Sequence, residues 1–198
     1  MMRKRELEIR LQSVRGFESP DAALEQYMTP ATIAADVLFE AYSRGDVAGL
    51  KVMDLGCGTG MLSIGAALLG AGMVVGFDTD PDALRVAEAN ARDLGADVSF
   101  SRARIDEIEE GADTVVMNPP FGCQTPHADR PFLERGLTLS DCVSSIHMAS
   151  TLDFVESYCD RRGRSVFWRR TYKYDIPHQF SFHSKEKQTV EVAAVGIR

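Results

Sequence analysis

Residues 51–60 read KVMDLGCGTG, a short apolar run followed by three closely spaced glycines. The apolar run predicts a buried strand, and the residues from Met61 to Leu69 predict a helix. Glycines between a strand and a helix let a ligand approach the backbone N–H groups at the start of that helix. The stretch therefore predicts a cofactor-binding loop at the carboxyl end of the first strand of an α/β protein.

The same alternation of short apolar runs and helical stretches continues to Met117. The expected order is strand, helix, strand, helix, strand, strand, over residues 51–55, 61–69, 73–77, 81–94, 97–101 and 113–117. Asp80 is the expected N-cap of the second of these helices. Buried strands separated by helices are typical of a parallel sheet covered on both faces. We therefore expect a Rossmann-like, doubly wound α/β fold.

Further elements are expected on both sides of this core. Ahead of it, residues 6–14 look helical, and Thr29 is expected to cap a second helix that starts with Pro30. Beyond it, we expect a loop to about residue 130, then a helix from 131, a strand at 143–146, a helix at 150–161 and antiparallel strands at 165–173 and 188–197. The chain would then be one domain, 1–198, in which a helical extension (1–48) precedes a seven-stranded sheet (49–198).

The composition is that of a soluble globular domain. The chain has 198 residues, of which 44% are hydrophobic and 26% charged, and this balance excludes disordered and collagen-like classes. Its four cysteines lie far apart, without the spacing of a zinc site or a disulfide scaffold. The first fifteen residues lack the apolar core of a secretory signal. We therefore expect a cytoplasmic protein with reduced thiols and no metal.

Charge along the chain argues against a membrane span and allows an anionic partner. Residues 55–77 carry no charge and are long enough to cross a bilayer. Seven of them are glycines, which would break the continuous helix that lipid requires. The formal net charge is −7, but residues 1–16 carry +3 and residues 161–198 carry +6. Such asymmetry permits a local phosphate-binding surface on an acidic protein.

An acidic residue, Asp78, ends the expected strand that follows the glycine loop and its helix, 18 residues beyond Gly60. A carboxylate at this place can accept hydrogen bonds from both hydroxyls of a ribose. The loop reads G-x-G-x-G followed by Met61, not the G-x-G-x-x-G of dinucleotide-binding folds. D-x-G-x-G-x-G with a downstream acid resembles the class I S-adenosyl-L-methionine-dependent methyltransferases. The resemblance implies that the loop holds the amino-acid end of S-adenosyl-L-methionine and Asp78 its ribose.

The fourth expected strand leads into MNPPFG, residues 117–122, on the same sheet edge as the glycine loop. Asn118-Pro119-Pro120-Phe121 resembles the signature of methyltransferases that act on N6 of adenine, N4 of cytosine or a glutamine amide. Such a nitrogen is a poor nucleophile because its lone pair is delocalised. The Asn118 side-chain oxygen and the Pro119 carbonyl can accept its two N–H bonds and stabilise the developing positive charge. The prolines stiffen the corner, and Phe121 offers a face for a base to stack on.

A closer resemblance covers nearly the whole chain. Residues 25–29 read EQYMT and residues 174–183 read YDIPHQFSFH. With the glycine loop and MNPPFG, these segments resemble the methyltransferase-like protein five family and its archaeal relatives. The resemblance implies methylation of N6 of an adenosine in small-subunit ribosomal RNA. As in the eukaryotic members, it also implies a small zinc-containing activator subunit as partner.

Matched residue by residue, the family implies a cofactor site built from the extension, the glycine loop and two later strand ends. Gln26 and Thr29, in the extension, would close over S-adenosyl-L-methionine. The acidic residue usually found near the cofactor's adenine is matched by Arg104, which leaves Ile105 or Asp106 for that contact. The loop residues expected in the site are Asp54, Gly56, Gly58, Thr59 and Met61.

The basic C-terminal part of the chain is the expected RNA surface. Its cations would meet phosphates and its aromatic rings would stack on unpaired bases; the residues are Arg169, Arg170, Lys173, Lys185, Lys187, Tyr172, Phe180 and Phe182. The alternative is an ordinary hairpin whose aromatic residues pack into the core.

Two other functions share these motifs. A protein-glutamine methyltransferase also acts on a nitrogen whose lone pair is delocalised. Such enzymes, however, usually have tyrosine after Pro-Pro and an N-terminal recognition domain. This chain has Phe121 and only 50 residues ahead of its first strand. The other alternative is a catalytically silent subunit that binds S-adenosyl-L-methionine or a partner methyltransferase. A silent subunit has no reason to keep the glycine loop, Asp78 and Asn118 together.

Overall fold

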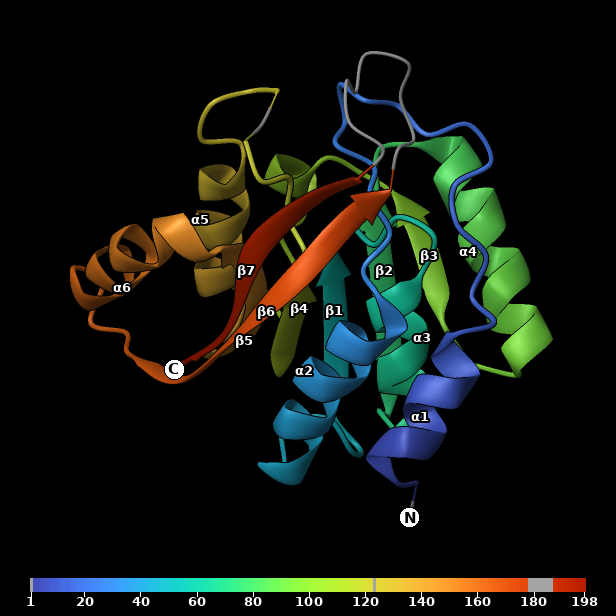
Figure 1. The fold of residues 1–198 in the computed structure, drawn as a ribbon. Helices are drawn as coiled ribbons and strands as arrows, with labels where there is room; N and C mark the ends of the chain where they lie inside the picture. Colours follow the sequence, from blue (N-terminus) through green and yellow to red (C-terminus); the bar gives the residue numbers. More distant parts are fainter. Residues whose placement is uncertain (1, 123, 178–186) are drawn as a thin grey trace.

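The computed structural model describes residues 2–122, 124–177 and 187–198. Its centre is a seven-stranded sheet in the order β3-β2-β1-β4-β5-β7-β6 (Figure 1). Strands β1 to β5 are parallel, and β7 pairs antiparallel with both β5 and β6. The strands are β1 (Lys51–Leu55), β2 (Met73–Asp78), β3 (Ser99–Arg102), β4 (Thr114–Met117), β5 (Cys142–Met148), β6 (Val166–Pro177) and β7 (Lys187–Ile197). The predicted doubly wound sheet with an antiparallel end is confirmed.

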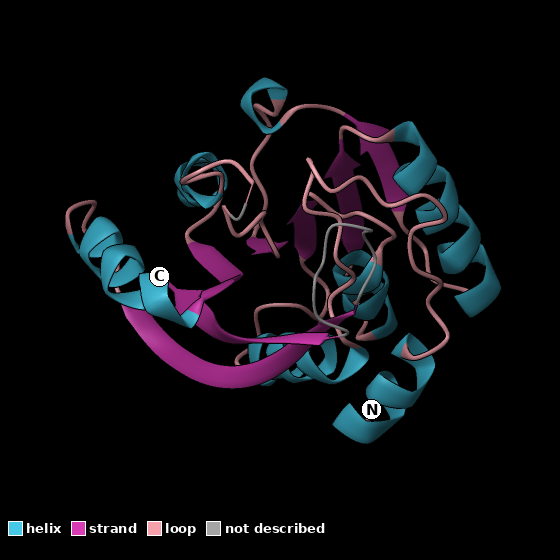
Figure 2. Ribbon diagram, turned by 45° about the horizontal axis from the view of Figure 1, so that its top comes forward, coloured by secondary structure: helices cyan, strands magenta, loops and turns pink. Residues whose placement is uncertain are grey.

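Helices cover both faces of the sheet (Figure 2). One face carries α1 (Lys4–Leu11), α2 (Ala31–Ser43), α3 (Met61–Leu68) and α4 (Pro81–Leu94), and the other carries α5 (Asp129–Leu139) and α6 (Leu152–Asp160). Short 3₁₀ turns, η1 (Ile105–Glu107) and η2 (Ala149–Thr151), complete the set. Because side chains alternate along a strand, Val116 joins the core under α1 to α4, whereas its neighbour Val115 joins the core under α5 and α6.

The chain reverses its winding between β1 and β4, which are neighbours in the sheet. After β1 it continues into α3 on one face, and after β4 it continues into α5 on the other. Leu55 is paired with Met117, so Gly56 and Asn118 begin adjacent loops at the carboxyl edge. Ligands of open α/β sheets bind at such a switch point.

The helix termini confirm one predicted cap and correct another. The Asp80 side chain accepts a hydrogen bond from the backbone N–H of Asp82 at 2.9 Å, so it caps α4 as predicted. Thr29 does not cap α2, because the N-cap position is Pro30 and no side chain caps that end. The Thr29 hydroxyl instead accepts a hydrogen bond from the Asn118 side chain. The prediction for Thr29 was wrong because a partner distant in sequence displaced the local one.

A carboxylate on α2 joins the N-terminal extension to strand β6. Asp36, on α2, accepts hydrogen bonds from Lys4 at 2.8 Å, from the Tyr172 hydroxyl at 2.7 Å and from Arg170. Burial disfavours the ionised form, but these three donors outweigh it and lower the pKa of Asp36 to about 2. Arg170 and Tyr172 therefore hold β6 against α2. The Arg170 side chain remains 47% exposed, so contact of these residues with RNA stays a prediction.

Candidate active site

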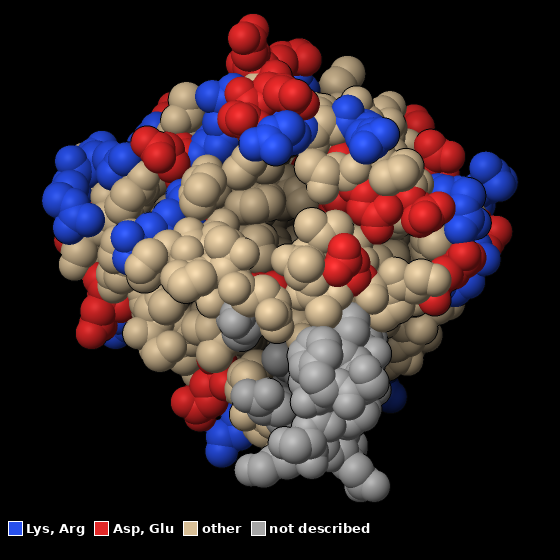
Figure 3. Space-filling view, turned by 90° about the horizontal axis from the view of Figure 1, so that it is seen from above, with Lys and Arg blue, Asp and Glu red and all other residues tan. Residues whose placement is uncertain are grey.

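A cavity of about 650 Å³ opens where β1 and β4 end. Figure 3 looks onto this edge of the sheet and shows a hollow bordered mainly by uncharged side chains. The structure brings together every predicted site residue except Pro119 and Phe121. Those that line the cavity are Gln26, Thr29, Asp54, Gly56, Gly58, Thr59, Met61, Asp78, Ile105, Asn118 and Pro120.

The glycine loop needs glycine both for its backbone and for space. Gly56 and Gly58 have φ angles of 72° and 53°, in the left-handed region that side chains disfavour. A Cβ on Gly58 would lie 2.9 Å from the ring of Phe17, and one on Gly56 would lie 3.0 Å from the ring of Phe132. Both rings also line the cavity. Sequence reasoning missed them, because an isolated phenylalanine gives no motif to recognise.

Asp54 places an unpaired acceptor in the cavity wall. Its Oδ2 atom accepts hydrogen bonds from the backbone N–H and the hydroxyl of Ser63, at 2.9 and 2.5 Å. Its Oδ1 atom is buried and has no hydrogen-bond partner in the described part of the chain. Burial raises the pKa of Asp54 to about 7, against the effect of the Ser63 hydrogen bonds. A buried acceptor without a partner marks a place where a ligand can supply a donor.

Asp78 ties the glycine loop to the turn that follows β2. Its carboxylate oxygens accept hydrogen bonds from the backbone N–H of Gly58 at 2.8 Å and of Asp80 at 3.0 Å. Burial raises its pKa, although these backbone donors oppose the shift. Each carboxylate oxygen can accept a second hydrogen bond, so the group can also receive two ribose hydroxyls.

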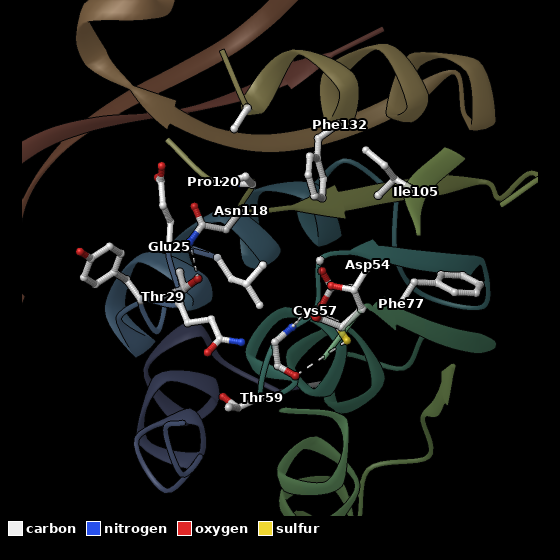
Figure 4. Close-up of a pocket in the computed structure, with 18 of the residues that line it drawn as sticks. Glu25, Thr29, Asp54, Cys57, Thr59, Phe77, Ile105, Asn118, Pro120 and Phe132 are labelled. Carbon is white, nitrogen blue, oxygen red and sulfur yellow. Dashed lines mark hydrogen bonds between the residues drawn. The ribbon is translucent and has the colours of Figure 1, made fainter. Parts of the chain in front are cut away.

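Asn118 lies opposite the glycine loop with its amide held in one direction (Figure 4). Its Nδ2 atom donates to the Thr29 hydroxyl at 2.9 Å. Its Oδ1 atom is buried and has no partner among the described residues. Asn118 follows Val116 by two positions, so it points toward the face that carries α2. The side chain thus has its nitrogen satisfied and its oxygen available.

The other three residues of the predicted catalytic corner differ in how they lie relative to the cavity. Pro120 lines the cavity. Pro119 is buried next to it. Phe121 is half-buried and packs beside the core cluster that contains Ile146 and Val192. Stacking of a base on Phe121 stays a prediction.

The segment that precedes α2 is fixed by its own polar contacts. The Gln26 side chain donates to the Asp80 carboxylate at 2.6 Å and accepts from the Asp21 backbone N–H at 2.7 Å. Both ends of the Gln26 amide are therefore engaged within the protein. The contact between Gln26 and a cofactor stays a prediction, although the residue lines the cavity.

The wall beyond Asp78 is mostly apolar. Phe77, Ile105 and Phe132 all line the cavity here (Figure 4). Arg104 and Asp106 also border the cavity, but they pair with each other, with 3.0 Å between Nε and Oδ1, and both side chains are exposed. Ile105 is therefore the apolar residue that this turn adds to the wall.

The described part of the predicted RNA surface is partly occupied by ion pairs. Arg169 contacts Glu156 at 2.6 Å, while Lys173 is exposed. Phe180, Phe182 and Lys185 lie outside the described residues, and the side chain of Lys187 is not described.

A search of the described helices for one with the length and hydropathy of a membrane span finds none.

The sheet order and the cavity at its switch point place the protein among the class I S-adenosyl-L-methionine-dependent methyltransferases. Solved structures agree with this class. A candidate RNA methyltransferase from Pyrococcus horikoshii, PH1948, superposes with a TM-score of 0.92 at 42% identity, over 100% of this chain and 98% of that one. The sequence model of the ribosomal protein L11 methyltransferase (PrmA) family matches residues 32–119, the part that holds the glycine loop and ends at the Asn-Pro corner.

Relatives that match over nearly their whole length identify the family of this chain. The chain is 36% identical to the rRNA N(6)-adenosine-methyltransferase METTL5 of Danio rerio, over 96% of each protein. It is 38% identical to the Drosophila melanogaster Mettl5 protein, over 96% of this chain and 94% of that one. It is also 37% identical to the MJ0284 protein of Methanocaldococcus jannaschii, over 100% of this chain and 94% of that one. The chain belongs to the METTL5 family.

Proposed function

We propose that this protein transfers a methyl group from S-adenosyl-L-methionine to N6 of an adenosine in structured RNA, and that small-subunit ribosomal RNA is the substrate. The observation that carries the proposal is the buried, unpartnered Oδ1 atom of Asn118 in the wall of the cavity. An acceptor in that position suits an amino group that donates hydrogen bonds. The names of the relatives from zebrafish and fruit fly support the choice of substrate.

The cavity suits the cofactor at each of its three parts. The unpaired oxygen of Asp54 can accept from the ammonium of the amino-acid end. Asp78 has acceptor capacity for the ribose hydroxyls, and it holds the glycine loop in place through the Gly58 N–H. Ile105 and Phe77 offer an apolar wall to the adenine. Gln26, Thr29, Thr59 and Met61 border the same space and would complete the site.

The reaction requires the protein to position the substrate amine and to stabilise the charge that develops on it. It does not require a general base. When bound, S-adenosyl-L-methionine supplies a methyl group that its sulfonium already activates. Asn118 and the Pro119 carbonyl would accept the two N–H bonds of the adenine amino group and hold its lone pair toward that methyl. They would also stabilise the positive charge that develops on the nitrogen. The methylated nitrogen can then lose its proton to water.

The alternative substrate, a glutamine side chain, is less well supported. The first 48 residues do not form a separate recognition domain, since α1 and α2 pack into the same core as α3 and the sheet.

An adenine in the RNA substrate must be unpaired or extruded to reach the cavity, because a stacked base in a duplex is inaccessible. Lys173, Arg169 and Arg170 are the cations of the predicted RNA surface whose side chains the structure describes, and all three are exposed.

We also propose that a small zinc-containing activator subunit binds this protein, as the family resemblance implies. The sheet offers two edges to such a partner, β3 and β6, each of which has one neighbour among the described strands. Mixing the protein with a candidate activator and measuring the molar mass of the product would test the interaction.

Labelled methyl transfer tests the activity. Ribosomal RNA that lacks the modification is incubated with the protein and tritiated S-adenosyl-L-methionine, then digested to nucleosides. We expect the label in N6-methyladenosine. Label in a protein fraction, or in another nucleoside, would contradict the proposal.

A further inference from the structure

The usefulness of Asn118 depends on which end of its amide meets the substrate. If the amide were turned by half a rotation, its N–H donors would face the N–H donors of the substrate amine. The oxygen is left available because Nδ2 donates to the Thr29 hydroxyl at 2.9 Å. Thr29 lies 89 positions away, directly ahead of α2, and is buried. In this structure the Thr29 hydroxyl therefore holds the nitrogen end of the amide, and the oxygen end is left for the substrate.

A second contact holds the middle of the same loop, which runs from Asn118 to the start of α5 at Asp129. The Glu25 carboxylate accepts hydrogen bonds from the backbone N–H groups of Gly122 at 3.1 Å and Gln124 at 2.8 Å. Glu25 is buried, and its carboxylate is turned away from the glycine loop (Figure 4). The loop that begins with Asn118 is thus held at its start and near its middle by one short segment, residues 25–29.

The gripping segment is itself held in place. Glu25 has a φ angle of 50°, a left-handed conformation that a residue with a side chain adopts only when its surroundings impose it. Backbone hydrogen bonds from Glu25 to Ala22 and from Gln26 to Asp21 close the turn. The Gln26 side chain then anchors the segment to Asp80, the cap of α4. The segment can therefore act as a fixed support for the loop.

We propose that Thr29 and Glu25 are positioning residues for the Asn-Pro-Pro-Phe loop: Thr29 orients the Asn118 amide, and Glu25 fixes the loop beyond Phe121. The proposal rests on the proposed function for its effect on turnover, but the contacts themselves can be tested without any substrate. It gives Thr29 a role in addition to the cofactor contact that the family resemblance implies.

The first test compares Thr29→Val, which removes the hydroxyl at nearly constant volume, with Thr29→Ser, which keeps it. Thr138→Val is the matched control, because the Thr138 hydroxyl bonds only within α5 and is exposed. We expect Thr29→Val to lower kcat by about tenfold or more. The kcat is measured at saturating S-adenosyl-L-methionine, so that a lost cofactor contact of Thr29 changes the affinity and not kcat. Thr29→Ser should recover most of the turnover. An unchanged kcat in Thr29→Val, or a kcat that Thr29→Ser does not recover, would overturn the proposal for Thr29.

The second test reads the contacts directly by nuclear magnetic resonance on the isotope-labelled full chain. The Asn118 side-chain amide, assigned by its absence in Asn118→Ala, should shift in Thr29→Val and return in Thr29→Ser. In the wild type, the backbone amides of Gly122 and Gln124 should exchange slowly with solvent, and Glu25→Gln should speed that exchange. Fast exchange in the wild type, or an Asn118 signal that ignores Thr29, would contradict the assignment. Absence of RNA methylation by the wild type would refute the proposed function and leave this readout intact.

Discussion

The two sides of the cavity are assembled in different ways. On the cofactor side, Asp54, the glycine loop and Asp78 lie within one β-α-β unit, and Asp78 bonds directly to Gly58. On the acceptor side, Asn118 takes its orientation from Thr29, on a segment that precedes the whole sheet. A short motif can therefore specify the first side, whereas the second exists only in the folded chain. Substitutions on the two sides should accordingly change different quantities.

The largest effect is expected from Asn118→Ala. This change removes the unpaired acceptor and should lower kcat by roughly 10²- to 10³-fold, the usual cost of losing one positioned transition-state contact. Affinity for S-adenosyl-L-homocysteine, measured by calorimetry, should remain close to that of the wild type. An equal loss of affinity would show that the two sides of the cavity are not separable.

Asp78→Ala should have the opposite signature. The ribose hydroxyls and the Gly58 N–H would lose their acceptor, so cofactor binding should weaken by about 1–3 kcal/mol. Turnover at saturating cofactor should be largely kept. Asp97→Ala, in the exposed turn before β3, is the control and should leave both quantities unchanged. A selective fall in kcat for Asp78→Ala would contradict its assignment to the cofactor side.

The affinity for the cofactor should also depend on pH through Asp54. The pKa of this carboxyl is raised to about 7 in the free protein, and an ammonium prefers the ionised form. Affinity should therefore rise with pH up to about 7, with a loss of up to about tenfold for each pH unit below that value, and fall again above about pH 8, where the α-ammonium of the ligand loses its own proton. Calorimetric titrations between pH 5.5 and 8.5, roughly spanning this pKa, would measure the profile. Asp54→Asn should flatten the rise, and an unaltered profile in that variant would assign the titration to another group.

The smallest effect is expected at the contact between the extension and the C-terminal strands. Tyr172→Phe removes one of the three donors to Asp36, which should lower the free energy of unfolding by about 1–2 kcal/mol. Because Tyr172 packs beside the core rather than facing solvent, RNA affinity should be unchanged. Denaturant titration and an RNA binding assay measure the two quantities. Weaker RNA binding with unchanged stability would return Tyr172 to the predicted RNA surface.

The sequence predicted most of the sheet because its signals are local. The helix predicted at 81–94 is α4, Pro81–Leu94, since both its cap and its proline lie at its own start. The strand predicted near 143–146 is longer, Cys142–Met148, because its last residues pair with Ala193 and Val192 of β7. Pairing across the sheet, which no local pattern encodes, extended the strand.

The contacts that the sequence did not predict concern side chains with a choice of partners. Thr29 was expected to cap α2 and instead bonds to Asn118. The bond from Arg170 to Asp36 was not expected either. Glu25 was part of a recognised motif, but its contacts with Gly122 and Gln124, which suggest its role, are visible only in the structure. In each case the partner lies far along the chain, and spacing cannot identify it.

The sequence by itself determined the cofactor loop, because glycines at 56, 58 and 60 impose a backbone that other residues disfavour, and Asp78 follows at the end of the next strand. It also determined that an asparagine stands beside that loop, since adjacent parallel strands end at the same edge. Only the tertiary structure decided which atom of Asn118 is left available. A hydrogen bond between residues 89 positions apart settles that direction, and such a bond forms only after the helices and the sheet have packed together.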